Sequence, residues 1–151
     1  MKTLQLLLLC LLLSPTVHAA EALTSLPSPY TPEQTLNRLE ADIAQRGLTL
    51  FARIDHAAGA TSVGQTLRPT TVLIFGNPRG GTPLMQCEQT LGIDLPLKIL
   101  VWQDTSGQVW LSYTEAAVLA DRRDAQGCPA LGNLGGVLAA LAQNAVSTVV
   151  E

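Results

Sequence analysis

The amino-acid sequence predicts an α+β domain with a mainly antiparallel sheet and helices packed on one face. The predicted order of elements is helix, strand, strand, short helix, hairpin and then helices. A doubly wound parallel sheet would instead show strands and helices alternating along the whole chain. About 130 residues remain once an N-terminal leader is set aside, which is the length of a single domain with one core. We therefore expect one compact domain.

The first twenty residues have the layout of a cleaved secretory signal. Lys2 is followed by a leucine-rich run from Leu4 to Leu13 and by small residues at Ala19 and Ala20. This apolar run is too short to cross a bilayer, and the small residues suit a signal peptidase. We expect residues 1–20 to be removed and residues 21–151 to form an exported domain, periplasmic or secreted, with no membrane attachment after cleavage.

The charge balance argues against a nucleic-acid partner. The full chain carries 9 basic and 12 acidic residues, a formal net charge of −3. Cleavage removes only one charge, that of Lys2, so the mature chain becomes more acidic by one unit. Nucleic-acid-binding proteins need a basic surface to neutralise phosphates.

The first long helix has clear start and stop signals. Thr31 suits the N-cap, Pro32 the first helical position, and Gln34 follows three residues after the cap. Gly47 marks the end, so the helix is predicted over about Pro32–Arg46. The ten residues before it contain two prolines, so they are expected to form only an edge strand.

Four segments read as strands. The alternation over Leu48–His56 predicts a half-buried strand, and the continuous apolar run Val72–Phe75 predicts a central strand. Leu95–Trp102 and Gln108–Tyr113 are separated by a short turn and are predicted to pair as a hairpin. Residues 57–67, between the first two strands, are either a short helix or a loop.

Three further helices are predicted. Thr82 followed by Pro83 repeats the cap-then-proline signal and predicts a short helix through about Thr90. Glu115–Arg123 has helical character. Leucines at helical spacing after Pro129 predict a C-terminal helix, although glycines near its start each cost about 1 kcal/mol relative to alanine.

Two cysteines, Cys87 and Cys128, remain after removal of the leader. An even pair in an exported protein indicates first a disulfide, which would stabilise the fold by roughly 4 kcal/mol. Two separate buried thiols and a redox or metal role are the alternatives.

Four blocks of the sequence resemble the bacterial family called domain of unknown function 302. In order they read "LFARIDHAAGA", "LRPTTVLIFGNPRGGTPLM", "IDLPLKILVW" and "WLSYTEAAVLADRR", and the resemblance spans about residues 30–145. It implies a compact α+β fold, in small and often exported bacterial proteins that form homodimers. It does not imply a reaction.

Three side chains are weak candidates for catalysis. His56 is the only histidine after cleavage, and Asp55 beside it would fix its tautomer for proton transfer. Alternatively, His56 closes the strand and bonds to the backbone. Lys98 lies in an otherwise apolar strand, where it either reaches water, pairs with Asp94 or Asp104, or lines a pocket with His56.

The "NPRGGTP" turn supplies the ligand-binding candidates, which are Asn77, Arg79, Gly80, Gly81 and Thr82. If the turn leads into a helix start, free backbone N–H groups and the adjacent guanidinium would attract an anion. The alternative is that glycine and proline serve only the backbone geometry of the turn.

The sequence shows no metal-ligand spacing, no cofactor motif and no Gly-x-Ser-x-Gly element of a hydrolase. We therefore expect a non-catalytic binding or accessory module for a small polar or acidic ligand, with no metal and no cofactor. One alternative is an enzyme that uses Asp55 and His56 as a proton-transfer pair. The other is a structural or partner-binding dimer joined through its sheet.

Overall fold

The computed structural model describes residues 23–148, so the predicted leader at 1–20 lies outside the described residues. Five strands form one sheet in the order β1-β5-β4-β3-β2, and all four pairings are antiparallel. The strands are β1 (Thr24–Ser28), β2 (Thr49–Asp55), β3 (Thr70–Gly76), β4 (Leu97–Gln103) and β5 (Val109–Tyr113). The helices are α1 (Pro32–Gln45), α2 (His56–Ser62), α3 (Pro78–Cys87), the 3₁₀-helix η1 (Gln89–Ile93), α4 (Ala116–Arg122) and α5 (Leu131–Val146). The predicted fold class is confirmed.

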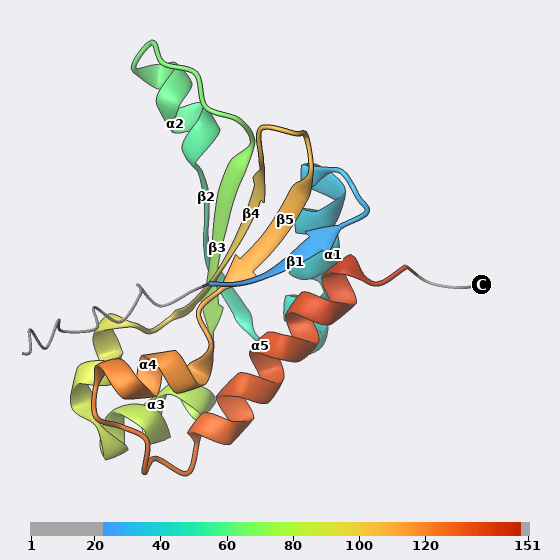
Figure 1. The fold of residues 1–151 in the computed structure, drawn as a ribbon. Coiled ribbons are helices and arrows are strands. Elements are labelled where there is room, and N and C mark those ends of the chain that lie inside the picture. Colours follow the sequence, from blue (N-terminus) through green and yellow to red (C-terminus); the bar gives the residue numbers. More distant parts are fainter. Residues whose placement is uncertain (1–22, 149–151) are drawn as a thin grey trace, which may run out of the picture.

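The long helices α1 and α5 cover one face of the sheet, α3 and α4 lie at one end of it, and α2 projects from the opposite end (Figure 1). The core lies between the sheet and the two long helices. Its fully buried side chains include Leu39 of α1, Phe75 of β3 and Leu141 of α5. Among the residues that the structure describes, no helix combines the length and apolar character needed to cross a membrane.

The N-terminal helix forms as the sequence predicts. The Thr31 hydroxyl accepts the Gln34 N–H, and the Gln34 side chain accepts the Thr31 N–H, which completes a capping box. These bonds satisfy N–H groups that a helix start otherwise leaves without partners. The helix ends at Gln45, and Gly47 follows with a φ of +65° that favours glycine.

Strand β2 is more exposed than its alternating sequence predicts. Six of its seven residues are exposed and only Ala52 is half-buried. The strand lies at the edge of the sheet, and its register with β3 shifts between Leu50 and Ala52. The prediction of a half-buried strand was therefore wrong, because the extra residue, Phe51, interrupts the alternation of faces.

The start of the third helix was also predicted wrongly. The helix begins at Pro78 rather than at Pro83, with Asn77 as its N-cap, and Pro83 lies inside it. Both prolines follow residues that can cap a helix, so the sequence pattern fits either start. Asn77 prevails because its side chain accepts the Gly80 N–H at 2.8 Å.

The other predicted elements are present. Residues 24–28 form the edge strand, β4 and β5 form the hairpin, and α4 and α5 lie close to their predicted bounds. Residues 57–67, for which the sequence allowed either a short helix or a loop, begin within helix α2 and continue as a loop after Ser62. Cys87 and Cys128 form the predicted disulfide.

The turn of the β4–β5 hairpin is organised by Asp104. Its Oδ1 accepts hydrogen bonds from the N–H and hydroxyl of Ser106 and from the Gln108 N–H, and its Oδ2 accepts the Trp110 indole N–H at 2.8 Å. Hydrogen bonds from Ser106 and then Trp110 lower the pKa of Asp104 from 3.8 to about 2. These bonds favour the ionised carboxylate.

We expect acid to weaken this turn between pH 4 and pH 2. Since the pKa in the folded state lies below that of the unfolded chain, the contribution of Asp104 is present above about pH 4 and is lost as the pH falls towards 2. An NMR titration should show the Asp104 carboxyl and the Trp110 indole N–H changing together near pH 2. Titration of Asp104 near pH 4 would contradict the role given to these hydrogen bonds.

Candidate functional site

The five ligand-binding candidates of the "NPRGGTP" turn line one cleft of about 760 Å³. The turn and α3 form one wall, residues of β2, β4 and the segment before β4 form a second, and the start of α5 forms a third. The volume is within the range of small-molecule sites, which is roughly 300–1,000 Å³. The structure therefore brings Asn77, Arg79, Gly80, Gly81 and Thr82 to a single concave surface.

The backbone N–H groups of this turn are largely used within the protein. Gly80 donates to the Asn77 side chain at 2.8 Å, Gly81 donates to the Asn77 carbonyl at 3.1 Å, and Pro78 has no N–H. Of the backbone N–H groups in residues 78–81, this leaves that of Arg79 to bind an anion. An anion site made of several helix N-terminal amides, as the sequence pattern suggested, is therefore not assembled here.

Among residues 23–148, Arg79 is the only ionisable side chain that lines the cleft. It is exposed and makes no hydrogen bond or ion pair with the described residues. Every other Lys or Arg within residues 23–148 has a hydrogen-bond or ion-pair partner: Arg38, Arg46, Arg53, Arg68, Lys98, Arg122 and Arg123. The cleft therefore contains one positive charge that no side chain in the described part of the protein neutralises.

The rest of the lining is mainly apolar. Phe51 and Met85 are exposed to 55% and 37%, which is high for side chains of their size and polarity. Leu95, Leu134 and Val137 also line the cleft and pack against the core, so they are held in place from behind. Apolar walls with a few polar groups are typical of ligand sites.

The disulfide joins two walls of this cleft. Cys87 is the last residue of α3, and Cys128 directly precedes Pro129 and Ala130, which line the cleft before α5 begins. Cys128 is 5% exposed and belongs to a small core with Leu84 and Leu91. The bridge therefore limits how far α3 and the start of α5 can separate.

The catalytic candidates lie elsewhere. The Asp55 carboxylate accepts the Ala58 N–H at 2.9 Å and so caps α2, while His56 is the exposed first residue of that helix. The Lys98 ammonium donates to the backbone carbonyls of Asp94 and Pro96, both at 3.1 Å. None of the three candidates lines the cleft. The alternative in which Lys98 lines a pocket with His56 is therefore not found at this cleft.

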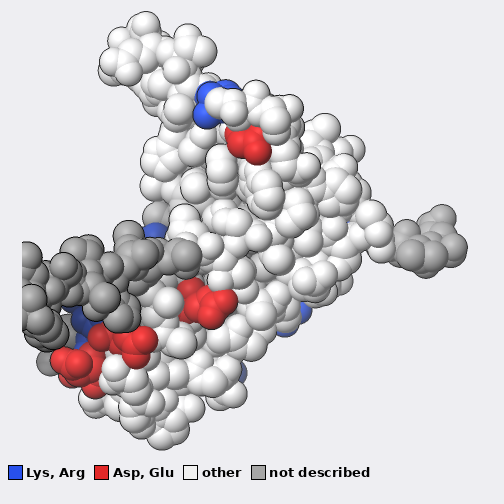
Figure 2. Space-filling view, viewed as in Figure 1, with Lys and Arg blue, Asp and Glu red and all other residues white. Residues whose placement is uncertain are grey.

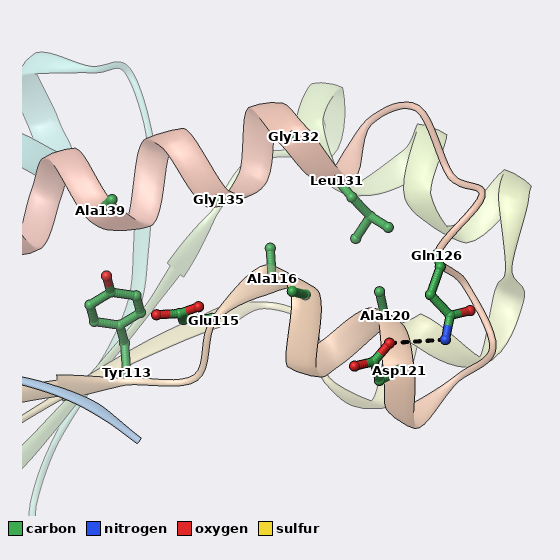
Figure 3. A pocket seen from close by; sticks show the side chains of 11 residues that line it. Tyr113, Glu115, Ala116, Ala120, Asp121, Gln126, Leu131, Gly132, Gly135 and Ala139 are labelled. Atoms are coloured by element: carbon green, nitrogen blue, oxygen red, sulfur yellow. Dashed lines mark hydrogen bonds between the residues drawn. The ribbon is translucent and has the colours of Figure 1, made fainter. Parts of the chain in front are cut away.

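A second, smaller cleft of about 510 Å³ lies between α4 and the glycine-rich first half of α5 (Figure 3). It is lined mostly by alanine and glycine, and its charged groups are Glu115 and Asp121. Asp121 accepts a hydrogen bond from Gln126 at 2.9 Å. Burial and the nearby Glu115 raise the pKa of Tyr113, which lines the same cleft. Both carboxylates already accept hydrogen bonds within the protein. This cleft therefore has fewer polar groups available to bind a ligand than the first cleft has.

No group of three or more His, Cys, Asp or Glu side chains capable of holding a metal ion is found in residues 23–148.

Sequence reasoning missed the parts of the cleft that come from outside the turn. Phe51 of β2 lies far from the turn in sequence, and so do Asn133 and Val137, which lie on consecutive turns of α5. The only local signal was Asn133 among the glycines at the start of the last helix, a polar residue where the apolar face was expected to begin.

A family model described as "Domain of unknown function DUF302" matches residues 24–142. The chain belongs to the DUF302 family. This confirms the resemblance identified from the four sequence blocks.

Other relatives of this DUF302 chain occur within longer proteins. Over 100 residues, 66% of this chain, it is 44% identical to "Fluoride-specific ion channel FluC 1" of Brucella suis and to the protein of the same name in Brucella abortus. The matched stretch is 39% and 37% of those two proteins. The chain therefore spans less than half the length of these curated relatives.

The fold is similar to that of a solved DUF302 protein. The crystal structure of an uncharacterized conserved DUF302 protein from Bacillus stearothermophilus superimposes with a TM-score of 0.75, covering 82% of this chain and 97% of that one. The two sequences are 18% identical. At this identity the similarity concerns the fold alone.

Proposed function

We propose that this DUF302 domain is a binding or accessory module that holds a small molecule in the cleft beside α3 and performs no chemistry of its own. The observation that carries the proposal is the convergence of five turn residues and several apolar side chains on one concave surface. The Brucella channels support an accessory role, because a similar stretch forms only 37–39% of their length. The enzyme alternative has less support, since Asp55 is already used to cap α2.

The proposal predicts that blocking the cleft abolishes ligand binding without unfolding the domain. Asn133 is exposed on α5 and lines the cleft, so Asn133→Trp should fill part of it and weaken binding at least ten-fold. Binding would be measured by following the Gly80 and Gly81 amide resonances while small carboxylic acids and alcohols of six to ten carbons (about the size the cleft admits) are added. Gln143→Trp, at an exposed position later in the same helix, is the matched control. Equal binding by both variants, or unmoved resonances in the native protein, would contradict the proposal.

We also propose that the protein works outside the cytoplasm, in the periplasm or as a secreted protein. The leader pattern of residues 1–20 supports export. The Cys87–Cys128 bridge is consistent with it, because disulfides persist in oxidising compartments.

A homodimer joined through the sheet is a second candidate, favoured by the apolar character of the face opposite α1 and α5. Half-buried Val72 of β3 lies opposite Leu100 of β4, and Trp102 lies opposite Trp110 with ring centroids 6.3 Å apart. The solvated face of an antiparallel sheet is usually polar, so an apolar one indicates an interface. These four side chains are uncharged, and the surface over β1, β4 and β5 shows few charges (Figure 2). Two identical copies that meet over these four side chains avoid charge repulsion there, although Lys98 lies on the same face of β4, two residues before Leu100.

This candidate predicts that a charge on the open face separates the subunits. Native mass spectrometry and light scattering should show a dimer for the native protein and a monomer for Leu100→Glu. Ile93→Glu is the matched control, because Ile93 is 73% exposed in η1, away from the sheet. A monomeric native protein would rule the candidate out, and circular dichroism would show whether each variant is folded.

A further inference from the structure

From the lining of the cleft we infer the class of its ligand: a molecule with an apolar body and one anionic group, such as a carboxylate, that pairs with Arg79. This inference rests on the proposed binding function. It goes further, because it assigns the two ends of the ligand to different parts of the cleft.

The apolar part of the cleft is suited to a hydrocarbon or aromatic body. Phe51 and Met85 offer exposed surface at the cleft, and Leu95, Leu134 and Val137 line it while packing against the core. A ligand that covers these side chains removes apolar surface from water, at about 25 cal/mol per Å². A purely polar ligand would cover the same side chains but would itself lose its hydrogen bonds to water without gaining others from these apolar walls.

The charge in the cleft favours a ligand whose polar end is anionic. No Asp or Glu of the described part of the chain lines the cleft, although the full sequence carries a net charge of −3. Arg79 contributes the single charge, and it has no partner among residues 23–148. A guanidinium binds a carboxylate through two parallel hydrogen bonds, so an anion is the group that this side chain recognises best.

Neighbouring polar groups of the cleft suit the same anion. The Asn77 Oδ1 is occupied by the Gly80 N–H, which leaves the two N–H bonds of the Asn77 amide group to donate. Thr82 adds a hydroxyl that also lines the cleft. Asn77 and Thr82 can therefore donate hydrogen bonds to an anion, whereas an ammonium group would find no carboxylate among the described residues that line the cleft.

The inference is tested with three probes that share one chain and differ in their head group: octanoate, 1-octanol and octylammonium. Dissociation constants would be measured at pH 7 from the shifts of the Gly80 and Gly81 amides, with the Gly64 and Gly107 amides as reference signals outside the cleft. The expected order of affinity is octanoate, octanol, octylammonium, with octanoate ahead of octanol on the order of five-fold, as for a partly exposed ion pair. Salt should reduce this preference.

Variants at Arg79 separate the charge from the apolar walls. Arg79→Gln should remove the preference for octanoate and leave octanol binding unchanged, and Arg79→Glu should make octylammonium the better ligand. Arg68→Gln is the matched control, because Arg68 donates to the Gln103 carbonyl away from the cleft. If all three probes bind equally, or if Arg79→Gln keeps the preference, the anionic class is overturned while the binding function stands. If no probe binds, the proposed function and this inference both fail.

Discussion

Removing the disulfide is expected to lower the free energy of unfolding by roughly 4 kcal/mol. The bridge closes a loop across a sequence separation of 41 residues, from the end of α3 to the residue before Pro129. In the unfolded chain this closure restricts the conformations available to the loop, and the restriction is lost with the bridge. The test is urea unfolding of Cys87→Ser/Cys128→Ala, in protein that begins at residue 21. Alanine is chosen at position 128 because that side chain is buried, where an unpaired hydroxyl would add its own cost.

Loss of the disulfide should also weaken ligand binding in the cleft. Since the bridge holds α3 beside the start of α5, the variant should bind octanol and octanoate more weakly while keeping its preference between them. The native protein unfolded in the presence of a reductant is the control and should show the same loss of stability. A change below about 1 kcal/mol would show that packing around Leu84 and Leu91 holds these segments together without the bridge.

The sequence predicted elements well wherever their determinants were local. The capping box of α1 involves only Thr31 and Gln34, which lie three residues apart, and both of its hydrogen bonds are present. The β4–β5 hairpin is set by its short turn, whose Asp104 bonds lie within six residues. In each case the residues that interact are neighbours in the chain, so the spacing alone contained the answer.

The start of α3 shows where local signals conflict. Two cap-then-proline pairs, Asn77-Pro78 and Thr82-Pro83, lie five residues apart, and either one could begin a helix. The structure uses the first and accommodates Pro83 within the helix. The five turn residues still line the cleft, although four of them, Arg79 to Thr82, belong to α3 itself and Asn77 caps it.

The burial of β2 and the walls of the cleft depended on the tertiary structure. The alternation of Leu50, Ala52 and Ile54 predicts one buried face, but the register shift after Leu50 places these residues on different faces. Leu50 pairs with buried Phe75 of β3, whereas Ala52 and Ile54 pair with half-buried Ile74 and Val72. Phe51, which interrupts the register, lines the cleft together with Val137 of α5. Sequence spacing cannot show that these two side chains, more than eighty residues apart, line the same cleft.

The chain contains two phenylalanines, and we expect their replacement by alanine to lower stability by very different amounts. Phe75 is fully buried between β3 and the long helices, so Phe75→Ala should cost about 3–5 kcal/mol through lost contacts and the cavity left behind. Phe51 is 55% exposed, so Phe51→Ala should cost less than about 1 kcal/mol. Urea unfolding of both variants measures the difference. Because a small domain has only about 5–15 kcal/mol of stability, Phe75→Leu, expected to cost below about 1.5 kcal/mol, serves if the alanine variant does not fold.

Ligand binding should show the reverse order. Phe51 lines the cleft, so Phe51→Ala should weaken octanoate and octanol to the same degree, whereas Arg79→Gln weakens octanoate alone. Phe75 is in the core and does not line the cleft, so Phe75→Leu should leave both affinities close to those of the native protein. The three variants therefore report on three different quantities. Phe75→Leu reports on the stability of the fold, Phe51→Ala on contacts with the apolar body of the ligand, and Arg79→Gln on recognition of its charge. If Phe51→Ala bound both probes as well as the native protein does, the apolar wall would have to lie elsewhere in the cleft.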